Sequence, residues 1–438
     1  MKSAFIVLLI LFNFPITAQK QATQLNQFIS ESLPRWYKQY QHLHANPEIS
    51  FQEKATAESM AEVLRGLGFE VTEGVGGYGV VGVLKNGNGP TVMVRTDTDA
   101  LPIIEETGLS YASKATTIDD EGNQVGVMHA CGHDLHMTVW SGTAELLVRH
   151  KDLWKGTVVF IAQPAEERSG GAKAMLADGL FEKFPRPEYA LALHTHAALA
   201  AGKIGYVTGY MMANVDFVKI TVYGKGGHGA YPHTTKDPIV LAAQIIMDLQ
   251  TIVSREISPL EPAVVTVGKI SGGTKANIIP DQVDMELTLR SYSDEVKQGL
   301  IDKIRRICNG AAMSAGLPET KYPEVWVRPE DTPAVYNDPE LTTQLAEKIG
   351  ETLGEAQVVE LKPVMGGEDF SRYGKVSPNI PICMLRLGVV SPEQIAAAEA
   401  GEIELPSLHS AKFAPEAEPA IETGVKAMSA AVLHLLSK

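Results

Sequence analysis

The sequence has no segment rich in lysine or arginine, and its formal net charge at pH 7 is −14. Nucleic-acid-binding proteins need clustered positive charge against the phosphate backbone, so this class of partner is excluded. The excess of acidic residues indicates a solvated surface. Internal repeats and low-complexity segments are absent as well. Of the 438 residues, 45 % are hydrophobic and 21 % are charged, which is typical of a soluble globular protein of two domains.

The apolar run Ala4–Phe12 is too short to span a bilayer, so no membrane span is expected. It follows Lys2 and precedes the small residue Ala18, which is the pattern of a cleaved signal peptide. We therefore expect residues 1–18 to be removed and the mature protein to be exported, either periplasmic or secreted. No cysteine is near this cleavage site, which argues against a lipid anchor. The alternative interpretation is a short buried N-terminal strand.

Cysteine is scarce, with only Cys131, Cys308 and Cys383 in the whole chain. An exported protein that relied on disulfide bonds would normally carry an even and denser set. An odd cysteine kept in such a protein indicates use in metal binding or in chemistry.

From about residue 30 to 207, helical and strand patterns alternate. Helices are expected around Met60–Leu67 and over Asp134–His150, with Leu135, Val139, Leu146 and Leu147 buried. Apolar strands are expected at Thr91–Arg95, Thr157–Gln163 and Tyr189–Leu193. This alternation predicts an α/β domain with a mainly parallel sheet and helices on both faces.

The pattern changes near residue 210. Strands are expected at Asp216–Tyr223, Ala263–Ile270 and Val283–Arg290, and apolar and polar residues alternate in the last of these. Alternation of period two is typical of a sheet with one wet face. Helices are expected at Asp237–Ser254 and around Val296–Ile307. The order β-α-β-β-α predicts an inserted α+β domain.

A proline-rich stretch, Tyr322–Pro333, precedes a renewed helix–strand alternation that starts at Asp338-Pro339. We therefore predict a catalytic domain in two parts, 25–209 and 326–438. A lid and dimerisation domain, 210–325, interrupts it.

Polar residues gather where the strands of the first domain are expected to end. Asp97 and Asp99 follow one strand, Glu166 and Glu167 follow another, and His194 follows a third. Ligands of open α/β sheets bind at the carboxyl ends of the strands, so these side chains should converge.

The segment Cys131-Gly132-His133 puts a thiolate and an imidazole two residues apart, and the glycine permits the tight turn that one metal site would require. Of the adjacent Glu166 and Glu167, one carboxylate could ligate metal while the other serves as general base. Two alternatives stay open: a solvated loop for the two glutamates, and a nucleophilic role for Cys131 with a histidine base.

Two glycine-rich stretches are interpreted differently. Gly74–Gly79 fits G-x-G-x-x-G, but a strand pattern follows it rather than a helix, so we predict a turn. Gly224–Gly229 places His228 on a flexible tip, where it is either an exposed loop residue or a donor to an oxyanion or carboxylate.

Ordered motifs run along nearly all of the mature chain: Leu43–Ser50 (LHANPEIS), Arg95–Ile103 (RTDTDALPI), Met128–His136 (MHACGHDLH), Gln163–Glu167 (QPAEE), Gly170–Gly179 (GGAKAMLADG), Gly226–His233 (GGHGAYPH), Ala263–Gly268 (AVVTVG), Asn277–Asp281 (NIIPD) and Gly367–Phe370 (GEDF). In this order they resemble the aminoacylase/carboxypeptidase family of dinuclear metallopeptidases. The resemblance is stronger to its amidohydrolase branch, which contains hippurate hydrolases, auxin-conjugate amino acid hydrolases and N-acetyl-diaminopimelate deacetylases.

The resemblance implies two divalent ions, zinc, manganese, cobalt or nickel, with Cys131 as the bridging ligand. The implied ligands are Cys131, His133, Glu167, His194 and His409. Asp97 would be an outer residue that orients His133 or another ligand, and Arg95 stands where other branches carry a ligand histidine. Two departures matter. His196 competes with His194 because Ala197 and Ala200 replace the usual prolines. Arg168 stands where relatives have a small residue, and it either narrows the pocket or pairs with a carboxylate.

The activity implied is hydrolysis of the amide bond of N-acyl amino acids by a metal-activated water, with Glu166 as general base. His228 would stabilise the oxyanion, Asn277 and Arg290 would hold the substrate carboxylate, and the lid would form a homodimer. For Arg290, a plain position on the wet face of a strand is the competing interpretation. The competing functions are a metallo-dipeptidase or carboxypeptidase and an inactive binding homologue.

Overall fold

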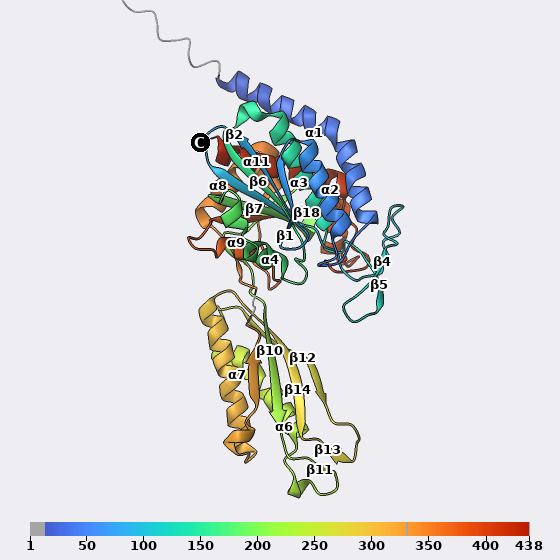
Figure 1. The fold of residues 1–438 in the computed structure, drawn as a ribbon, viewed down its shortest axis with the longest axis vertical. Helices are drawn as coiled ribbons and strands as arrows, with labels where there is room; N and C mark the ends of the chain where they lie inside the picture. The colour runs from blue at the N-terminus through green and yellow to red at the C-terminus, as the bar shows by residue number, and fades with distance from the viewer. Residues whose placement is uncertain (1–13, 330–331, 438) are drawn as a thin grey trace, which may run out of the picture. The chain divides into compact units, whose positions relative to one another are not determined.

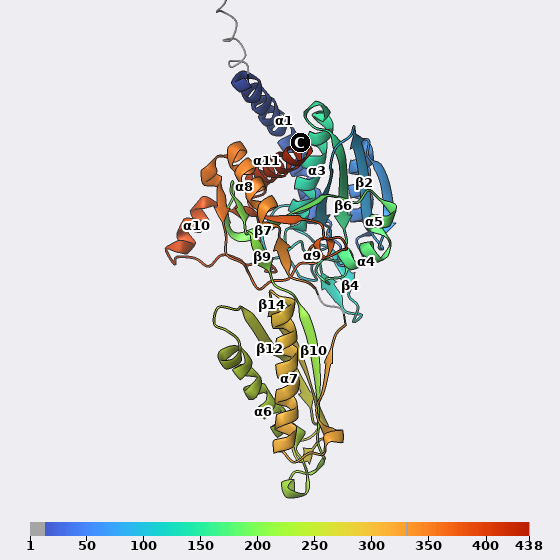
Figure 2. The same ribbon diagram turned by 90° about the vertical axis from the view of Figure 1, so that its left-hand side faces the viewer.

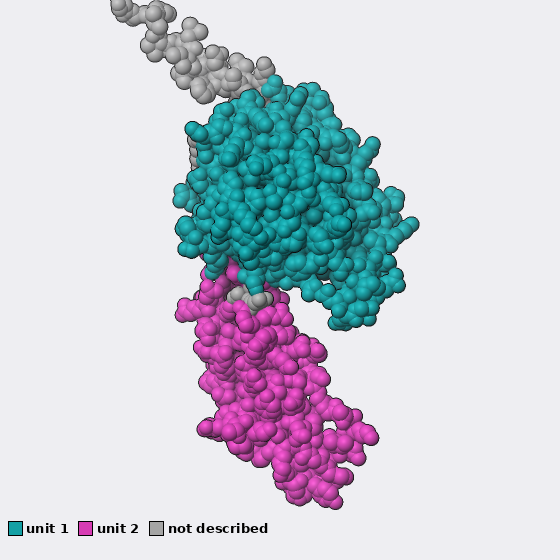
Figure 3. All heavy atoms as spheres, in the orientation of Figure 1, with its two compact units in different colours: residues 1–209, 337–361, 372–438 teal, residues 210–336, 362–371 magenta. Residues whose placement is uncertain are grey.

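The computed structural model describes residues 14–329 and 332–437, and side chains from residue 22 onward. The chain forms two compact units (Figure 3). The first consists of Met1–Gly209, Asn337–Leu361 and Arg372–Lys438, and the second of Tyr210–Tyr336 and Lys362–Ser371. Each unit has its own hydrophobic core. The second unit is therefore an insertion in the first.

The first unit is built on an eight-stranded sheet with the order β1-β2-β6-β3-β7-β18-β8-β17 (Figure 1). Strand β3 pairs in parallel with β6 and β7, and β18 pairs in parallel with β7. The strands are β1 (Glu70–Val75), β2 (Gly79–Asn86), β3 (Thr91–Asp97), β6 (Gly156–Gln163), β7 (Tyr189–Ala200), β8 (Ile204–Tyr206), β17 (Val358–Glu360) and β18 (Ile382–Val390). Strands β6 and β18 are buried along almost their whole length because both faces of the sheet are covered. The mainly parallel sheet is confirmed.

Two consecutive crossovers run in opposite directions along the sheet. Helix α3 (His133–Arg149) connects β3 to β6, whereas α4 (Gly171–Ala177) and α5 (Leu180–Lys183) connect β6 to β7 beyond β3. Because parallel crossovers are almost always right-handed, opposite directions put α3 and α4 on opposite faces. The helix layer of α3 also contains α1 (Phe14–Ala45), α2 (Lys54–Gly66), α8 (Pro339–Leu353) and α11 (Ala417–Leu436), as Figure 2 shows.

The core residues expected in α3 are buried, since Leu135, Val139, Leu146 and Leu147 are all at most 1 % exposed. Burying a side chain of this size contributes roughly 1.5–3 kcal/mol. The turn expected at Gly74–Gly79 is also confirmed, because it joins β1 directly to β2 in an antiparallel pair. There Gly76 has φ +66°, and a Cβ atom would lie 2.4 Å from the backbone nitrogen of Met175.

The second unit holds an antiparallel sheet of order β12-β14-β10-β15. Along β14 every second residue is buried, which confirms the strand with one wet face. The elements are β10 (Asp216–Tyr223), α6 (Pro238–Thr251), β12 (Ala263–Gly272), β14 (Gln282–Ser291), α7 (Asp294–Ser314) and β15 (Glu324–Val327), with a small ribbon of β11 (Gly227–His228) and β13 (Ile278–Ile279). Asp237 caps α6 by accepting from the backbone N–H of Ile239.

The second unit is larger than the expected range 210–325. The proline-rich stretch Tyr322–Pro333, for which no strand was expected, contains β15, which pairs with β10 and completes the sheet. A strand of four residues is too short to give a clear alternation, and prolines lie close on either side of it. Residues 362–371 also belong to this unit, although they lie within the expected second part of the catalytic domain, 326–438.

Most of the expected signal peptide, residues 1–13, lies outside the described residues. Residues 14–18 open α1, so the expected cleavage site after Ala18 falls near the start of this helix. Within the described ranges, no helix has the length and apolarity needed to cross a membrane.

Candidate active site

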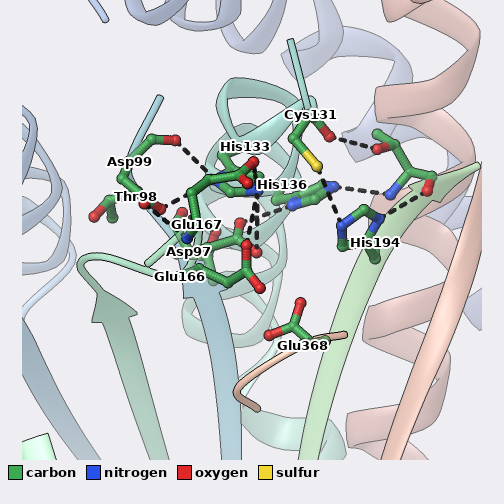
Figure 4. Close-up of polar contacts among 12 residues, drawn as sticks. Asp97, Thr98, Asp99, Cys131, His133, His136, Glu166, Glu167, His194 and Glu368 are labelled. Carbon is green, nitrogen blue, oxygen red and sulfur yellow. Dashed lines mark hydrogen bonds and ion pairs between the residues drawn. The ribbon is translucent and has the colours of Figure 1, made fainter. Parts of the chain in front are cut away.

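The polar residues expected at the strand ends do converge (Figure 4). Asp97 ends β3, Glu166 and Glu167 follow β6, and these parallel strands end at the same edge of the sheet. His194 was expected just after its strand, but β7 continues to Ala200 and pairs with β18 on either side of His194. The apolar stretch is only the first part of this strand, which explains the early predicted end.

Two groups of potential ligand atoms share one thiol. Cys131, His133 and His194 form the first, and Cys131, Glu167 and His409 form the second, with the ligand atoms of each group within 4.8 Å of one another. Cys131 Sγ lies 3.5 Å from His194 Nε2, and His409 Nε2 lies 3.4 Å from Glu167 Oε1. All five residues expected as ligands are therefore in one place.

The tight turn at the thiol is built by the backbone. Gly132 has φ +83° and immediately precedes the first residue of α3, His133. A Cβ at Gly132 would lie 2.7 Å from the Cγ2 of Thr195, so only glycine fits. The hydroxyl of Thr195 donates to the carbonyl oxygen of Cys131 (2.7 Å), and the N–H of His409 donates to the carbonyl oxygen of Ala130 (2.9 Å). These bonds fix two expected ligands beside the thiol.

The hydrogen bonds of the two histidines set their tautomers. His133 Nδ1 lies 2.7 Å from the carbonyl oxygen of Asp99, and His194 Nδ1 lies 2.8 Å from that of Thr195. A carbonyl oxygen only accepts, so Nδ1 carries the proton in each ring. Each Nε2 then presents its lone pair to the cluster, as metal ligation requires.

The cluster fits divalent cations. His133 Nε2 and Glu167 Oε1 are buried, have no hydrogen-bond partner, and lie 3.8 Å apart. Unpaired buried polar atoms are costly, and a cation between them would remove that cost. Burial and the charge of Glu167 raise the pKa of the Cys131 thiol. Burial acts to lower the pKa of His133, but Asp97, Asp99 and Cys131 outweigh it and raise that pKa. The site is thus organised around positive charge.

Asp97 makes its hydrogen bonds to residues other than His133. Its Oδ1 lies 2.7 Å from His136 Nδ1, its Oδ2 accepts from Arg95 Nη1 at 2.7 Å, and His133 Nε2 is 3.7 Å away. His136 Nε2 in turn accepts from the N–H of Thr195 (2.8 Å). The side chain of Asp97 therefore supports the backbone next to His194, while His133 Nδ1 bonds to Asp99.

Sequence reasoning did not identify His136, although it lies one helical turn after His133 in the same motif. A histidine three residues after an expected ligand, inside an otherwise buried helix, was the available signal.

The two departures noted in the sequence are resolved locally. His196 accepts from the N–H of Ala198 (3.2 Å), and within the described residues the ligand groups include His194 but not His196. Arg168 forms an ion pair with Asp120 and lies over the ring of Phe51 at 5.7 Å, and its side chain is half exposed. The interpretation that Arg168 pairs with a carboxylate is thus supported. Arg95, placed between Asp97 and Gln163, belongs to no ligand group.

The three residues expected on the lid belong to the second unit. His228 is exposed at the tip formed by β11 and β13, where it pairs with Ile278, the neighbour of Asn277. Arg290 lies on the wet face of β14 toward its other end and is half buried, which lowers its pKa. The structure therefore brings His228 and Asn277 together and leaves Arg290 apart from them. Their roles at the site remain predictions.

Comparison with known proteins agrees with this geometry. The model of Peptidase family M20/M25/M40 matches residues 93–412. Thermostable carboxypeptidase 2 of Saccharolobus solfataricus is 39 % identical over 77 % of this chain and 82 % of its own length. Hippurate hydrolase of Campylobacter jejuni is 39 % identical over 76 % of this chain and 82 % of its own.

A solved structure is similar over almost the whole chain. It is the YXEP protein of Bacillus subtilis, described as a dinuclear metal binding peptidase from the M20 family, with a TM-score of 0.76 and 31 % identity. The match covers 93 % of this chain and 99 % of that one. With a family model over most of its length and relatives at this identity, the chain is a metallohydrolase of the M20 amidohydrolase and peptidase family.

Proposed function

We propose that this enzyme hydrolyses the amide bond of N-acyl amino acids, with two divalent ions held by the five-residue cluster. The observation that carries the proposal is that two ligand groups share Cys131 while a further buried carboxylate, Glu166, lies directly beside them. Similarity to a hippurate hydrolase supports an acyl amino acid as substrate, since hippurate belongs to that class.

Cys131 would bridge the ions, with His133 and His194 on one side and Glu167 and His409 on the other. Two such ions supply a lowered pKa for bound water and polarisation of the amide carbonyl. A thiolate among imidazole and carboxylate ligands suits zinc, manganese, cobalt or nickel.

Glu166 is placed for proton transfer. Its carboxylate is 7 % exposed and its Oε2 lies 3.9 Å from His133 Nε2, so it borders the cluster without belonging to either group that contains Cys131. There it would accept a proton from the attacking water and return it to the leaving amine. The proposed donor to the oxyanion is His228, and Asn277 and Arg290 are proposed to hold the substrate carboxylate as the lid closes.

Similarity to a thermostable carboxypeptidase favours a second candidate, a peptidase that uses the same ions. An inactive homologue is disfavoured because the expected ligands and Glu166 are all present and buried or half-buried at one place, apart from the more exposed His409. A cysteine nucleophile is disfavoured because burial raises the pKa of Cys131, and the thiol is the weaker nucleophile.

We further propose a homodimer formed through the second unit. Strand β12 is an edge of its sheet and is largely exposed. On this strand Ile270 is 51 % exposed, and on α6 Val240 and Met247 are 65 % and 69 % exposed. An unpaired edge beside exposed apolar side chains is typical of an association surface. Met247→Lys and Ile270→Lys should shift the mass in solution, measured by light scattering, from dimer to monomer, and a native dimer in both variants would overturn this surface.

Export remains a proposal that rests on the N-terminal sequence pattern. Periplasmic and medium fractions should contain the protein with Gln19 as its first residue, and full-length protein confined to the cytoplasm would contradict it.

The activity is tested on a panel of N-acetyl and N-benzoyl amino acids and plain dipeptides. Each would be assayed with protein as purified, after chelation, and after addition of Zn or Mn. Glu166→Gln is the test variant, and Glu145→Gln is the matched control, since Glu145 lies on α3 and its carboxylate accepts from Arg35 and Trp36 of α1.

Metal-dependent release of amino acid from acyl substrates, lost only in Glu166→Gln, is the expected result. Activity confined to dipeptides would favour the peptidase, and activity that survives chelation would return Cys131 as nucleophile. Metal binding without any turnover would favour the inactive homologue.

A further inference from the structure

Backbone strain gathers around the turn that carries the two glutamates. In the described residues, the non-glycine positions with positive φ are Phe51 (63°), Ala165 (51°), Ser169 (53°) and His409 (66°). Such conformations cost of order 1–3 kcal/mol each and persist where the surroundings enforce them. One of them is an expected ligand, Ala165 immediately precedes Glu166, and Ser169 follows Glu167 by two residues. Something must hold this turn.

The turn closes partly on itself. The N–H of Ser169 donates to the carbonyl of Glu166 (2.6 Å), and those of Gly170 and Gly171 donate to the carbonyl of Ala165 (3.1 Å). The N–H groups of Ala165 and Glu167 have partners outside the turn, and both are buried carboxylates. Glu167 N–H donates to Asp99 Oδ2 (3.0 Å), and Ala165 N–H donates to Glu53 Oε1 (2.7 Å).

Glu53 has no other evident task. It immediately precedes α2, but its side chain makes no capping bond to that helix. Glu48 caps α2 instead, accepting from the N–H of Thr56 at 2.8 Å. Glu53 is fully buried, and its Oε2 has no hydrogen-bond partner. A carboxylate kept at that cost for a single bond indicates that the bond matters.

The same short segment supports the turn from two sides. Ser50 Oγ donates to Asp99 Oδ2 at 2.6 Å, and Asp99 Oδ2 is the acceptor for the Glu167 N–H. Glu53, three residues later, holds Ala165. The backbone on either side of Glu166 is thus fastened to residues 50–53 or to their direct partner.

We propose that Glu53 is a positioning residue, whose Oε1 holds Ala165 in its left-handed conformation and thereby sets the direction of the Glu166 carboxylate. The inference rests on the proposed role of Glu166 as general base. Removal of the acceptor lets Ala165 relax toward ordinary φ, which rotates the chain that leads into Glu166. The hydrogen bond of the Glu53 side chain is to the backbone of Ala165 and not to an expected metal ligand.

The test compares Glu53→Ala with Glu53→Gln in metal-loaded enzyme. Gln keeps a carbonyl oxygen for the Ala165 N–H, so its kcat should stay near wild type. In Glu53→Ala, kcat should fall on the order of a hundredfold with KM little changed, as for a small displacement of a catalytic group. The control is Glu48→Ala, which removes the α2 cap and lowers the melting temperature but leaves kcat in place.

Two further measurements test whether Glu53 acts through the conformation of Ala165, and the second of them does not depend on turnover. Ala165→Gly makes the left-handed conformation cost-free, so it should restore part of the kcat lost in Glu53→Ala. Hydrogen exchange of peptides that contain Ala165 should be faster in Glu53→Ala than in wild type and Glu53→Gln, while peptides from β7 exchange as before.

An unchanged kcat in Glu53→Ala, or a Glu53→Gln variant as impaired as Glu53→Ala, would overturn the positioning role. So would unchanged exchange at Ala165. Wild-type protein without activity on any substrate of the panel would instead overturn the proposed function, and the exchange measurement would still decide whether Glu53 holds Ala165.

Discussion

The residues assigned to the sheet edge and those assigned to the lid tip differ in what surrounds them. Cys131, His133 and His194 are at most 5 % exposed, and each side chain has contacts that restrict its chemistry. His228 and Asn277 are exposed, so water can satisfy their polar atoms without a protein partner. A buried polar group must be satisfied, so its partners reveal its role, whereas an exposed one is satisfied by water. The predictions below test this difference.

The largest effect is expected at the sheet edge. Glu166→Gln keeps the shape of the side chain and removes the base, so kcat should fall about 10²–10⁴-fold. Metal content, measured by elemental analysis, should match wild type because in the proposed arrangement the ions are held by the five-residue cluster, although Glu166 also lies in a potential ligand group with His133 and Glu167. A variant that loses its metal would show that Glu166 is a ligand instead.

At the lid tip, His228→Ala should lower kcat about 10²–10³-fold if this histidine donates to the oxyanion. The melting temperature should not change, because the side chain is exposed. Steady-state kinetics and thermal unfolding of the same preparation give both values. Full activity in His228→Ala would show that the lid tip takes no part in the reaction and that the residues at the sheet edge are sufficient.

Glu53 predicts a dependence of stability on pH. Burial, with a contribution from the charge of Asp99, raises its pKa from 4.5 to about 7. Between these values the folded protein holds a proton that the unfolded chain releases, so this stability is complete below about pH 4.5 and lost as pH rises through 7.

Glu53→Gln removes that dependence. Relative to wild type, its free energy of unfolding should rise by up to about 3 kcal/mol between pH 4.5 and 7.5. Urea titrations of chelated protein measure it, since a nearby cation would lower the pKa of Glu53. A constant difference across this range would contradict the raised pKa.

The smallest effect is expected at the exposed ion pair between Arg168 and Asp120. Arg168 and Asp120 form an ion pair with side chains 50 % and 63 % exposed, and pairs of this kind contribute about 0.2–1 kcal/mol. Arg168→Ala should therefore leave the free energy of unfolding nearly unchanged. If urea titration instead showed a loss of several kcal/mol in the free energy of unfolding, the contact between Arg168 and the ring of Phe51 would contribute packing energy beyond that of the exposed ion pair.

Much of the fold followed from periodicity. The apolar strands β3, β6 and β7 and the alternating β14 were visible because each extends over enough residues to show its pattern. Strand β15 was missed because four residues beside prolines show no clear period. The end of β7 was misplaced because its second half, from His194, mixes polar and small residues.

The site was only partly predictable. The family resemblance implied that Cys131, Glu167 and His409 share one site, although they are far apart in the chain. The sequence could not show which backbone N–H groups are held by side chains around the site. Glu53 acts on the N–H of Ala165, and His136 acts on that of Thr195. Main-chain donors are present at every residue, so no residue type marks which of them needs an acceptor.

The strand order has a consequence for biosynthesis. Strand β18 is formed by residues 382–390, far along the chain from β7 (Tyr189–Ala200), yet it lies inside the sheet between β7 and β8. Until those residues leave the ribosome, the nascent chain cannot close the middle of its sheet, and two strand edges stay unpaired. Loss of β18 would therefore remove an interior strand of the catalytic unit rather than its margin. Until that strand is made, the unit exposes strand edges through which aggregation can begin.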